Sequence, residues 1–169
     1  AGLIRIAPFR ARRIGLIQTR LAETAEKMLD KTAQVTAGRA AALGCILLPE
    51  RRCAHDPDAL RSEIRSLRDV VPAGIVAAGG TVEHFGMPVD PGNLLLLAQI
   101  DEIPVLGLPG CARSPKLNGV DWVLQRLVAG LSVGREDIMG MGIGGLLTEI
   151  PSRPQPRLQA ADAAAAEAP

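Results

Sequence analysis

The sequence predicts an α/β fold, a three-layer sandwich in which helices cover a mostly parallel sheet. Short apolar runs of strand length alternate with helical patterns along the chain. Such alternation favours parallel strands joined by right-handed crossovers. The chain has 169 residues, enough for one domain with a sizeable core. We expect that domain over residues 1–157, followed by a low-complexity tail at residues 158–169.

The first half of the chain supplies the beginning of this pattern. Apolar residues at three- and four-residue steps predict helices, and short buried runs predict strands. In order, we expect a strand at Ile14–Ile17, a helix from Leu21 to Leu43 that Gly44 ends, a strand at Cys45–Leu48, a polar loop at Pro49–Pro57, a helix starting at Asp56-Pro57 and another helix near Pro72.

The middle of the chain contains two glycine–proline turns, at Gly86–Asn93 and Gly107–Ser114. A strand at Val82–Phe85 leads into the first turn, and apolar strands at Leu94–Ala98 and Ile103–Leu108 lie between the two. Ser114 is a suitable N-cap and Pro115 a suitable first residue for the helix that follows. Free backbone N–H groups at such a helix start attract anions, so we expect the turn at Pro109–Lys116 to bind an oxyanion.

These paired turns resemble the molybdopterin-binding domain of molybdenum cofactor biosynthesis proteins, the family of the molybdopterin adenylyltransferases and molybdate-insertion enzymes. The matching residues are Pro91-Gly92, Leu94–Ala98, Val105–Gly110 and Ser114. The residues of the two turns are similar to those of a proteobacterial subgroup, in which this domain is sometimes fused to a cofactor cytidylyltransferase. The resemblance covers roughly Pro8 to Arg157. It implies that the end of the first strand borders the ligand cleft, with Thr19, Lys31 and Thr32 as contributors.

The resemblance implies a site for molybdopterin, or for its nucleotide or molybdenum form, and leaves open whether Mg²⁺ and a nucleotide also bind. The alternatives are a non-catalytic cofactor-binding or scaffold module, and a nucleotide-processing hydrolase of the same fold. Whether the protein is an enzyme stays open; an active one would be a transferase. The expected ligand-binding residues are Gly86, Pro88, Asp90, Pro91, Gly92, Asn93, Gly107, Pro109, Gly110, Arg113, Ser114, Lys116, Asn118 and Asp121.

Three departures from the family pattern argue for an altered or impaired site. Val89-Asp90 stands where the molybdate-insertion branch tends to carry basic residues. The family's Gly-Gly/Ser loop with its catalytic acid has no counterpart, because Gly79-Gly80 lies in the wrong context. Only residues 68–71 separate two predicted helices, too few for the expected strand, so we expect the sheet to lack one central strand–loop unit. The glycine-rich Met139–Leu147 is expected to be an irregular packing segment or edge strand.

Composition limits the partners. A formal charge of +1 and a 2% aromatic content argue against nucleic-acid binding, and no apolar run is long enough to span a membrane. Three cysteines without paired spacing predict neither a disulfide framework nor a metal site, which favours the cytoplasm. A start at Ala1 is typical of a processed protein or of a piece of a longer one. The resemblance implies a homo-oligomer that binds a pterin phosphate, and partnership with a cytidylyltransferase or a molybdoenzyme.

Overall fold

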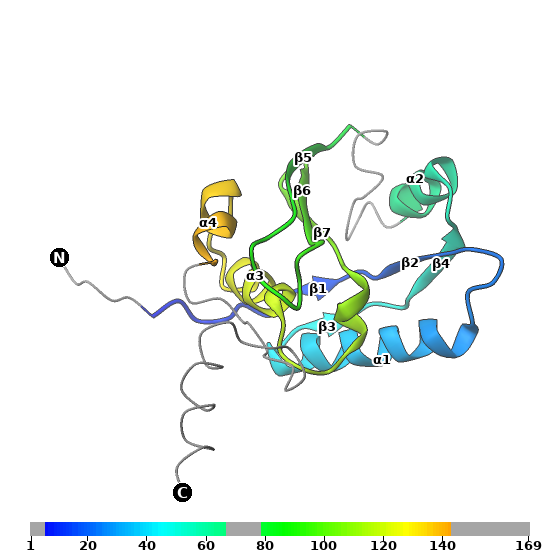
Figure 1. Ribbon diagram of the computed structural model, residues 1–169, viewed down its shortest axis with the longest axis horizontal. Helices are drawn as coiled ribbons and strands as arrows, with labels where there is room; N and C mark the ends of the chain where they lie inside the picture. The colour runs from blue at the N-terminus through cyan, green and yellow to red at the C-terminus, as the bar shows by residue number, and fades with distance from the viewer. Residues whose placement is uncertain (1–5, 67–78, 143–169) are drawn as a thin grey trace, which may run out of the picture.

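The computed structural model describes residues 6–66 and 79–142 of the chain (Figure 1). The tail at 158–169, the predicted helix near Pro72 and the junction after Ser66 lie outside the described residues. The first described segment contains β1 (Arg13–Ile14), β2 (Ile17–Arg20), α1 (Glu26–Ala42), β3 (Ile46–Leu47), β4 (Arg51–Ala54) and α2 (Pro57–Ser66). The second contains β5 (Thr81–Phe85), β6 (Leu96–Ile100), β7 (Ile103–Gly107), the 3₁₀ helix η1 (Gly110–Arg113), α3 (Gly119–Val128) and α4 (Arg135–Gly140).

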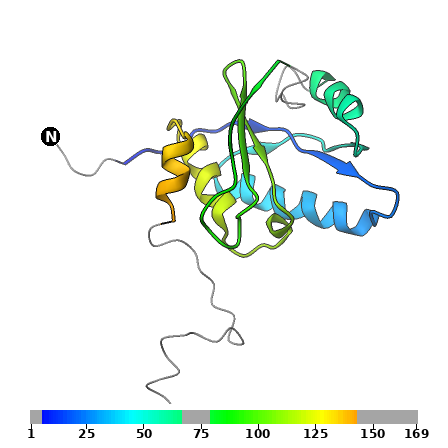
Figure 2. The same ribbon diagram turned by 45° about the horizontal axis from the view of Figure 1, so that its top comes forward.

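The first segment forms two short parallel pairs, β1 with β3 and β2 with β4. Figures 1 and 2 both show α1 on one side of β2 and β4 and α2 on the other. The predicted end of the first helix and the predicted start of the second agree with the structure, whereas α1 begins at Glu26, five residues after the predicted Leu21. Gly44, with φ of +68°, follows Leu43, the C-cap of α1, and Asp56 caps α2 by accepting bonds from the N–H groups of Asp58 and Ala59.

The prediction of a mostly parallel sheet is wrong for the described residues. β5, β6 and β7 form a three-stranded sheet in which both pairings are antiparallel, and the parallel pairing is confined to two-stranded sheets. In Figures 1 and 2 this antiparallel sheet runs across the direction of β2 and β4 instead of continuing their sheet. The three-layer sandwich around one sheet is therefore replaced by small sheets set at different orientations.

Connection length explains the antiparallel pairing. Ile100 pairs with Ile103, so only Asp101 and Glu102 join β6 to β7, and Asp101 has a φ of 49°. A two-residue connection closes an antiparallel hairpin, whereas a parallel crossover needs a dozen residues or more. The turn from Gly86 to Asn93 joins β5 to β6 without a helix, and it has the same effect on that pair.

Two further elements differ from expectation. The predicted polar loop at Pro49–Pro57 contains β4, in which Cys53 is buried, Arg52 is partly buried and Arg51 is exposed. Met139 and Gly140 end the helix α4 and therefore belong neither to an edge strand nor to an irregular segment. Residues 143–147 of that glycine-rich stretch lie outside the described part of the chain.

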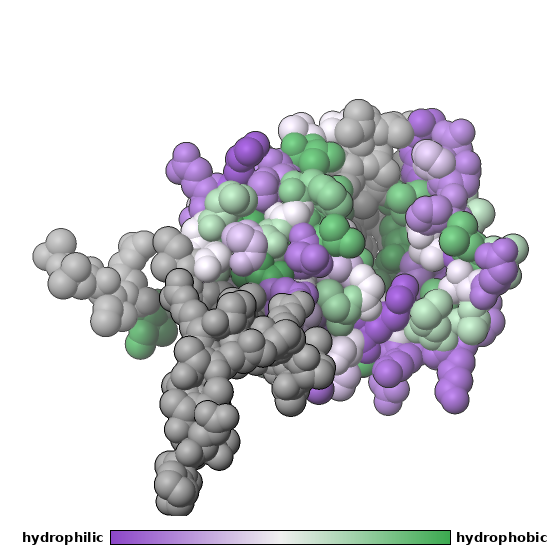
Figure 3. All heavy atoms as spheres, in the orientation of Figure 1, coloured by the Kyte–Doolittle hydropathy of each residue, from purple (hydrophilic) through white to green (hydrophobic). Residues whose placement is uncertain are grey.

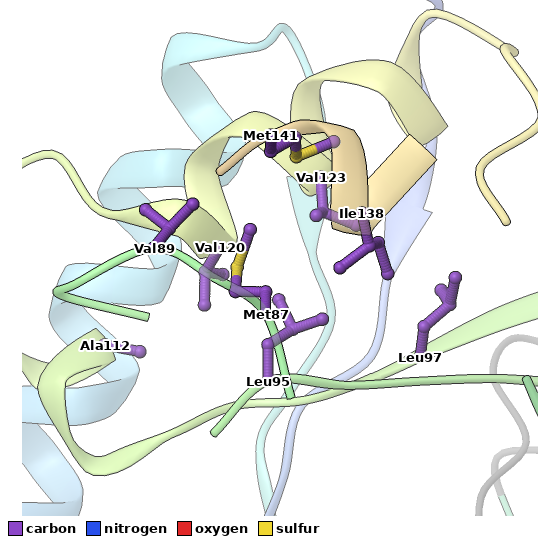
Figure 4. Close-up of a cluster of buried hydrophobic side chains, with 9 residues drawn as sticks. All are labelled: Met87, Val89, Leu95, Leu97, Ala112, Val120, Val123, Ile138 and Met141. Atoms are coloured by element: carbon purple, nitrogen blue, oxygen red, sulfur yellow. The ribbon is translucent and has the colours of Figure 1, made fainter. Parts of the chain in front are cut away.

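The largest cluster of buried side chains lies between the antiparallel sheet and helices α3 and α4 (Figure 4). Leu95, Val123 and Ile138 are each 0% exposed there. A smaller cluster joins α1 to α3 through Ala40, Leu43, Cys45 and Val128. The main cluster consists of Met87, Val89, Leu95, Leu97, Ala112, Val120, Val123, Ile138 and Met141.

Candidate functional site

The first glycine–proline turn folds back on itself and packs against α3. The N–H of Gly86 donates to the carbonyl of Leu95 at 2.7 Å, and the N–H of Met87 donates to that of Asn93 at 2.9 Å. Gly92 has a φ of +133°, and a Cβ there would lie 2.9 Å from the nitrogen of Gly119. Only glycine tolerates both the conformation and this close approach. The apolar side chains of Met87 and Val89 enter the main cluster, as Figure 4 shows.

The second turn is held by one arginine of helix α1. Arg39 donates from Nε to Oδ1 of Asp121 at 2.6 Å, and its side chain is only 12% exposed. Its terminal nitrogens donate to three carbonyl oxygens of the turn, those of Ala112 at 2.7 Å, Ser114 at 2.8 Å and Lys116 at 3.3 Å. The turn thus presents carbonyl groups inward to a cation, and its shape is fixed by a residue more than seventy positions away in sequence.

Helix α3 begins at Gly119, not at the predicted Ser114-Pro115. Ser114 instead terminates η1, where its N–H donates to the carbonyl of Cys111. The true N-cap is Asn118, which is 0% exposed. Its side-chain oxygen accepts from the N–H of Val120, while the carboxylate of Asp121 accepts from the N–H of Asn118, each at 2.8 Å. This reciprocal arrangement is a capping box, and it makes both side chains structural.

The first N–H groups of α3 are engaged inside the protein. Besides the two capping bonds, the N–H of Gly119 donates to the carbonyl of Pro91 at 2.8 Å, and that of Asp121 donates to the carbonyl of Asn118. These N–H groups are not directed at a ligand. Oxyanion binding by the turn stays a prediction, and the groups that remain for it are exposed side chains, above all Arg113 and Lys116.

A groove with a volume of about 980 Å³ separates the two parallel pairs from the antiparallel sheet. Its two walls are lined by unbroken runs of residues, 11–19 on one side and 102–108 on the other. Its base is formed by α1 and α3, through side chains that include Met28, Leu29, Leu124 and Val128. Figure 3 shows a hollow flanked by hydrophobic atoms between the part that carries α2 and the part that carries β5 to β7.

Polar groups are sparse in the groove and lie mainly along its rim. The hydroxyl of Thr19 and Nδ1 of His55 are 2.8 Å apart, and both residues line the groove. Thr32 and Thr36 also line it, but each donates its hydroxyl to a carbonyl one turn earlier in α1. Arg12, Arg13 and Arg113 line the groove as exposed cations.

The structure divides the predicted site residues between two places. Gly107 and Arg113 line the groove, together with Thr19 and Thr32 from the first strand and helix. Ser114 and Lys116 follow Arg113 on the same Arg39-bound turn, with Pro109 and Gly110 just before it. Gly119 links this turn to the first one, whose exposed Asp90 and Asn93 do not line the groove. The members of the first turn are Gly86, Pro88, Asp90, Pro91, Gly92 and Asn93.

Sequence reasoning missed the residues that bring these parts together. Arg39 lies in the last turn of α1, where a basic residue is normally solvated, so no local signal distinguishes it. His55 is exposed, and its contact with Thr19 follows from the pairing of β2 with β4, which no local pattern reveals. The Asn118–Asp121 capping box did have a sequence signal, a capping residue followed three positions later by a carboxylate.

The three cysteines are all free thiols, and they differ in their surroundings. Cys53 is buried on β4, and burial together with nearby Glu63 and Asp56 raises the pKa of its thiol. Cys111 in η1 is only half-buried. Among the described residues, no three His, Cys, Asp or Glu side chains lie close enough together to hold a metal ion.

A comparison of the chain with models of known protein families finds no match. A search of curated proteins finds none either. Within the described residues, no helix has the length and apolar character needed to cross a membrane.

Proposed function

We propose that the protein binds a pterin phosphate of the molybdopterin class at the rim of the groove, as a step in molybdenum cofactor biosynthesis. The observation that carries the proposal is the pair of exposed cations, Arg113 and Lys116, on a turn that Arg39 holds in place. Neither cation has a carboxylate partner within the described residues. A fixed turn with free cations suits a phosphate, since little ordering is needed when the anion binds.

The groove beside these cations is large enough for a flat ligand. Its volume of about 980 Å³ lies at the upper end of the range for small-molecule sites. The base runs along α1 from Met28 to Arg39, a length of about 16 Å at 1.5 Å per residue. A pterin ring could pack on the aliphatic walls near Gly107 while its phosphate contacts Arg113. The first turn contributes by positioning α3 and not by touching the ligand.

The proposal describes binding and leaves turnover to experiment. Titration of the protein with a fluorescent pterin phosphate should give saturable quenching, which inorganic phosphate weakens by competition. Arg113→Ala and Lys116→Ala should each lower the affinity about tenfold or more, because each removes a charge-assisted contact. Arg135→Ala, which removes an exposed arginine of α4 outside the groove, is the matched control. Equal affinity in all three variants would contradict the proposal.

One observation favours a second candidate, hydrolysis of a nucleotide phosphoanhydride. The Thr19 hydroxyl lies 2.8 Å from His55 Nδ1 within the groove, so an imidazole stands beside a polar oxygen where a ligand could lie. An imidazole within hydrogen-bond reach of water can act as a general base. Release of phosphate or pyrophosphate from nucleoside triphosphates that is lost in His55→Ala would establish this function. No release in the unaltered protein, together with pterin binding, would establish a non-catalytic binding module.

A further inference from the structure

We propose that the groove between residues 11–19 and 102–108 is a docking site for an extended peptide strand from a partner protein, apolar in its body and acidic at one end. This interaction goes beyond the binding of a pterin phosphate, whose phosphate is assigned to Arg113 and Lys116, and the peptide would compete with the pterin ring for the groove. The peptide would lie along the first wall, residues 11–19, and hydrogen-bond to its backbone, by addition of a strand to an open sheet edge.

The pattern of lining residues indicates that the two walls are strand edges. Side chains alternate between the two faces of a strand, so a pocket against one face is lined by every second residue. Here consecutive residues line the groove on both walls, residues 11–19 and residues 102–108. We infer from these unbroken runs that backbone edges, and not only one face of each strand, border the groove. β2 pairs only with β4 and β7 only with β6 among the described strands, so these edges have no strand partner there.

The hydrogen-bond alternation on the first wall identifies its free groups. The carbonyls of Arg12, Ile14 and Leu16 accept from the N–H groups of Ile46, Leu48 and Arg51 on the opposite side. Backbone groups of successive residues in a strand point in opposite directions. Those of Arg13, Gly15 and Ile17 therefore point toward the groove.

The second wall offers fewer donors because of Pro104. Proline has no N–H and occurs in sheets on edge strands, with its nitrogen side away from the partner strand. This places the backbone groups of Ile103, Val105 and Gly107 toward β6 and those of Leu106 toward the groove. A strand that bonds to Arg13, Gly15 and Ile17 on the first wall would cross this second wall, because the antiparallel sheet runs across the direction of β2.

Charge complementarity specifies the occupant. The cations Arg12 and Arg13 stand exposed where the first wall begins, and no ion pair of either is found among the described residues. Glu102, at the start of the second wall, is the only carboxylate that lines the groove in the described part of the chain. The base and walls between these points carry aliphatic side chains. An apolar strand of about five residues with acidic residues at one end satisfies both features.

A labelled synthetic peptide tests the proposal on the full chain. The probe carries two aspartates followed by alternating valine and isoleucine, and its binding is followed by fluorescence anisotropy. We expect saturable binding that weakens about tenfold or more when alternate amides of the peptide are N-methylated, because only the backbone bonds are lost. Replacing the two aspartates by lysines should weaken binding as well. Equal affinities of the N-methylated and unmethylated peptides would overturn the proposal, and this comparison requires no variant of the protein.

Matched variants locate the site. Thr36→Trp places a large ring in the groove and should abolish peptide binding, whereas Gln34→Trp on the exposed side of the same helix should leave it unchanged. Arg13→Glu should weaken binding of the acidic peptide and strengthen that of the lysine peptide.

Arg113→Ala should lower the affinity for the pterin phosphate more than the affinity for the peptide, which separates the two proposals. Light scattering completes the test. If the unaltered protein is a dimer and Thr36→Trp is a monomer, a second copy of the chain occupies the groove. That result would overturn the assignment of the groove to a partner peptide.

Discussion

The two sides of the groove are stabilised by different interactions. The side with β5 to β7, α3 and α4 buries nine apolar side chains in one cluster, and Leu95, Val123 and Ile138 have no exposed surface. The side with β1 to β4 and α1 has a smaller cluster of four buried residues, to which α3 contributes Val128. It relies more on polar contacts, such as those of Gln18 with Leu29 and Glu50.

This difference bears on where a ligand or partner can bind. A tightly packed cluster holds a loop in one shape, and the first glycine–proline turn is fixed in that way through Met87 and Val89. Some apolar side chains on the other wall and base of the groove, such as Ile14, Ile17 and Leu124, are only half-buried, so they gain burial when something fills it. The packed side therefore provides the scaffold, and the surface between the two sides provides the site.

The largest expected effect comes from opening a cavity in the packed side. Leu95→Ala should lower the free energy of unfolding by about 4 kcal/mol, because it removes a fully buried side chain from a cluster that cannot collapse around the gap. Leu94→Ala is the matched control, since Leu94 is 58% exposed and its truncation should cost less than about 1 kcal/mol. Urea unfolding of both variants measures the difference. Similar losses would mean that the packed cluster does not carry the stability of this side.

Arg39 provides the next largest effect, because it connects the two sides. Arg39→Ala leaves Asp121 without its partner and three carbonyl oxygens without a donor, so we expect a loss of about 3 kcal/mol. Arg39→Lys should restore only part of this, since one ammonium cannot reproduce the fork of bonds. Arg20→Ala breaks an ion pair whose partners are 52% and 57% exposed, and it should cost less than about 1 kcal/mol.

The same variant links stability to function. The second turn should lose its fixed shape in Arg39→Ala, so affinity for a pterin phosphate should fall even at temperatures where the protein stays folded. Circular dichroism and ligand titration on the same sample separate the two effects. Unchanged affinity in a destabilised variant would show that Arg113 and Lys116 do not depend on the turn for their placement.

Local elements could be predicted from the sequence where one signal dominated. The helix ended by Gly44 and the helix capped by Asp56 were predicted from such signals, as were the two apolar strands between the turns. The start of α3 was placed four to five residues too early, because Ser114-Pro115 was a stronger local signal than the Asn118–Asp121 capping box. β4 was missed, since Arg51 and Arg52 give it the composition of a loop.

Strand direction and the groove could be predicted to different extents. The short connection at Asp101-Glu102 indicates an antiparallel hairpin, but the prediction followed the alternation of strands and helices along the chain instead. The groove depends on residues 11–19 facing residues 102–108, and no local pattern encodes a contact between segments so far apart in sequence. Arg39 is hidden for the same reason, because its partners lie 73 or more positions away.

The smallest expected effect concerns the polar contacts of the side that carries β1 to β4 and α1. Arg52 lies 2.7 Å from Glu50, 2.7 Å from Asp30 and 2.5 Å from Glu26, and its bonds to Glu50 and Asp30 raise the pKa of its guanidinium further above its ordinary value. A raised pKa in a base contributes stability at every pH below the unfolded value, so this contribution should stay constant from pH 5 to pH 9. Arg52→Gln should destabilise the protein slightly, because it leaves three carboxylates close together. Added salt should reduce the deficit by screening their repulsion, whereas salt should not rescue Leu95→Ala, whose loss is one of packing. Urea unfolding at low and high salt makes the comparison, and a salt-independent deficit in Arg52→Gln would assign its role to packing of the arginine stem instead.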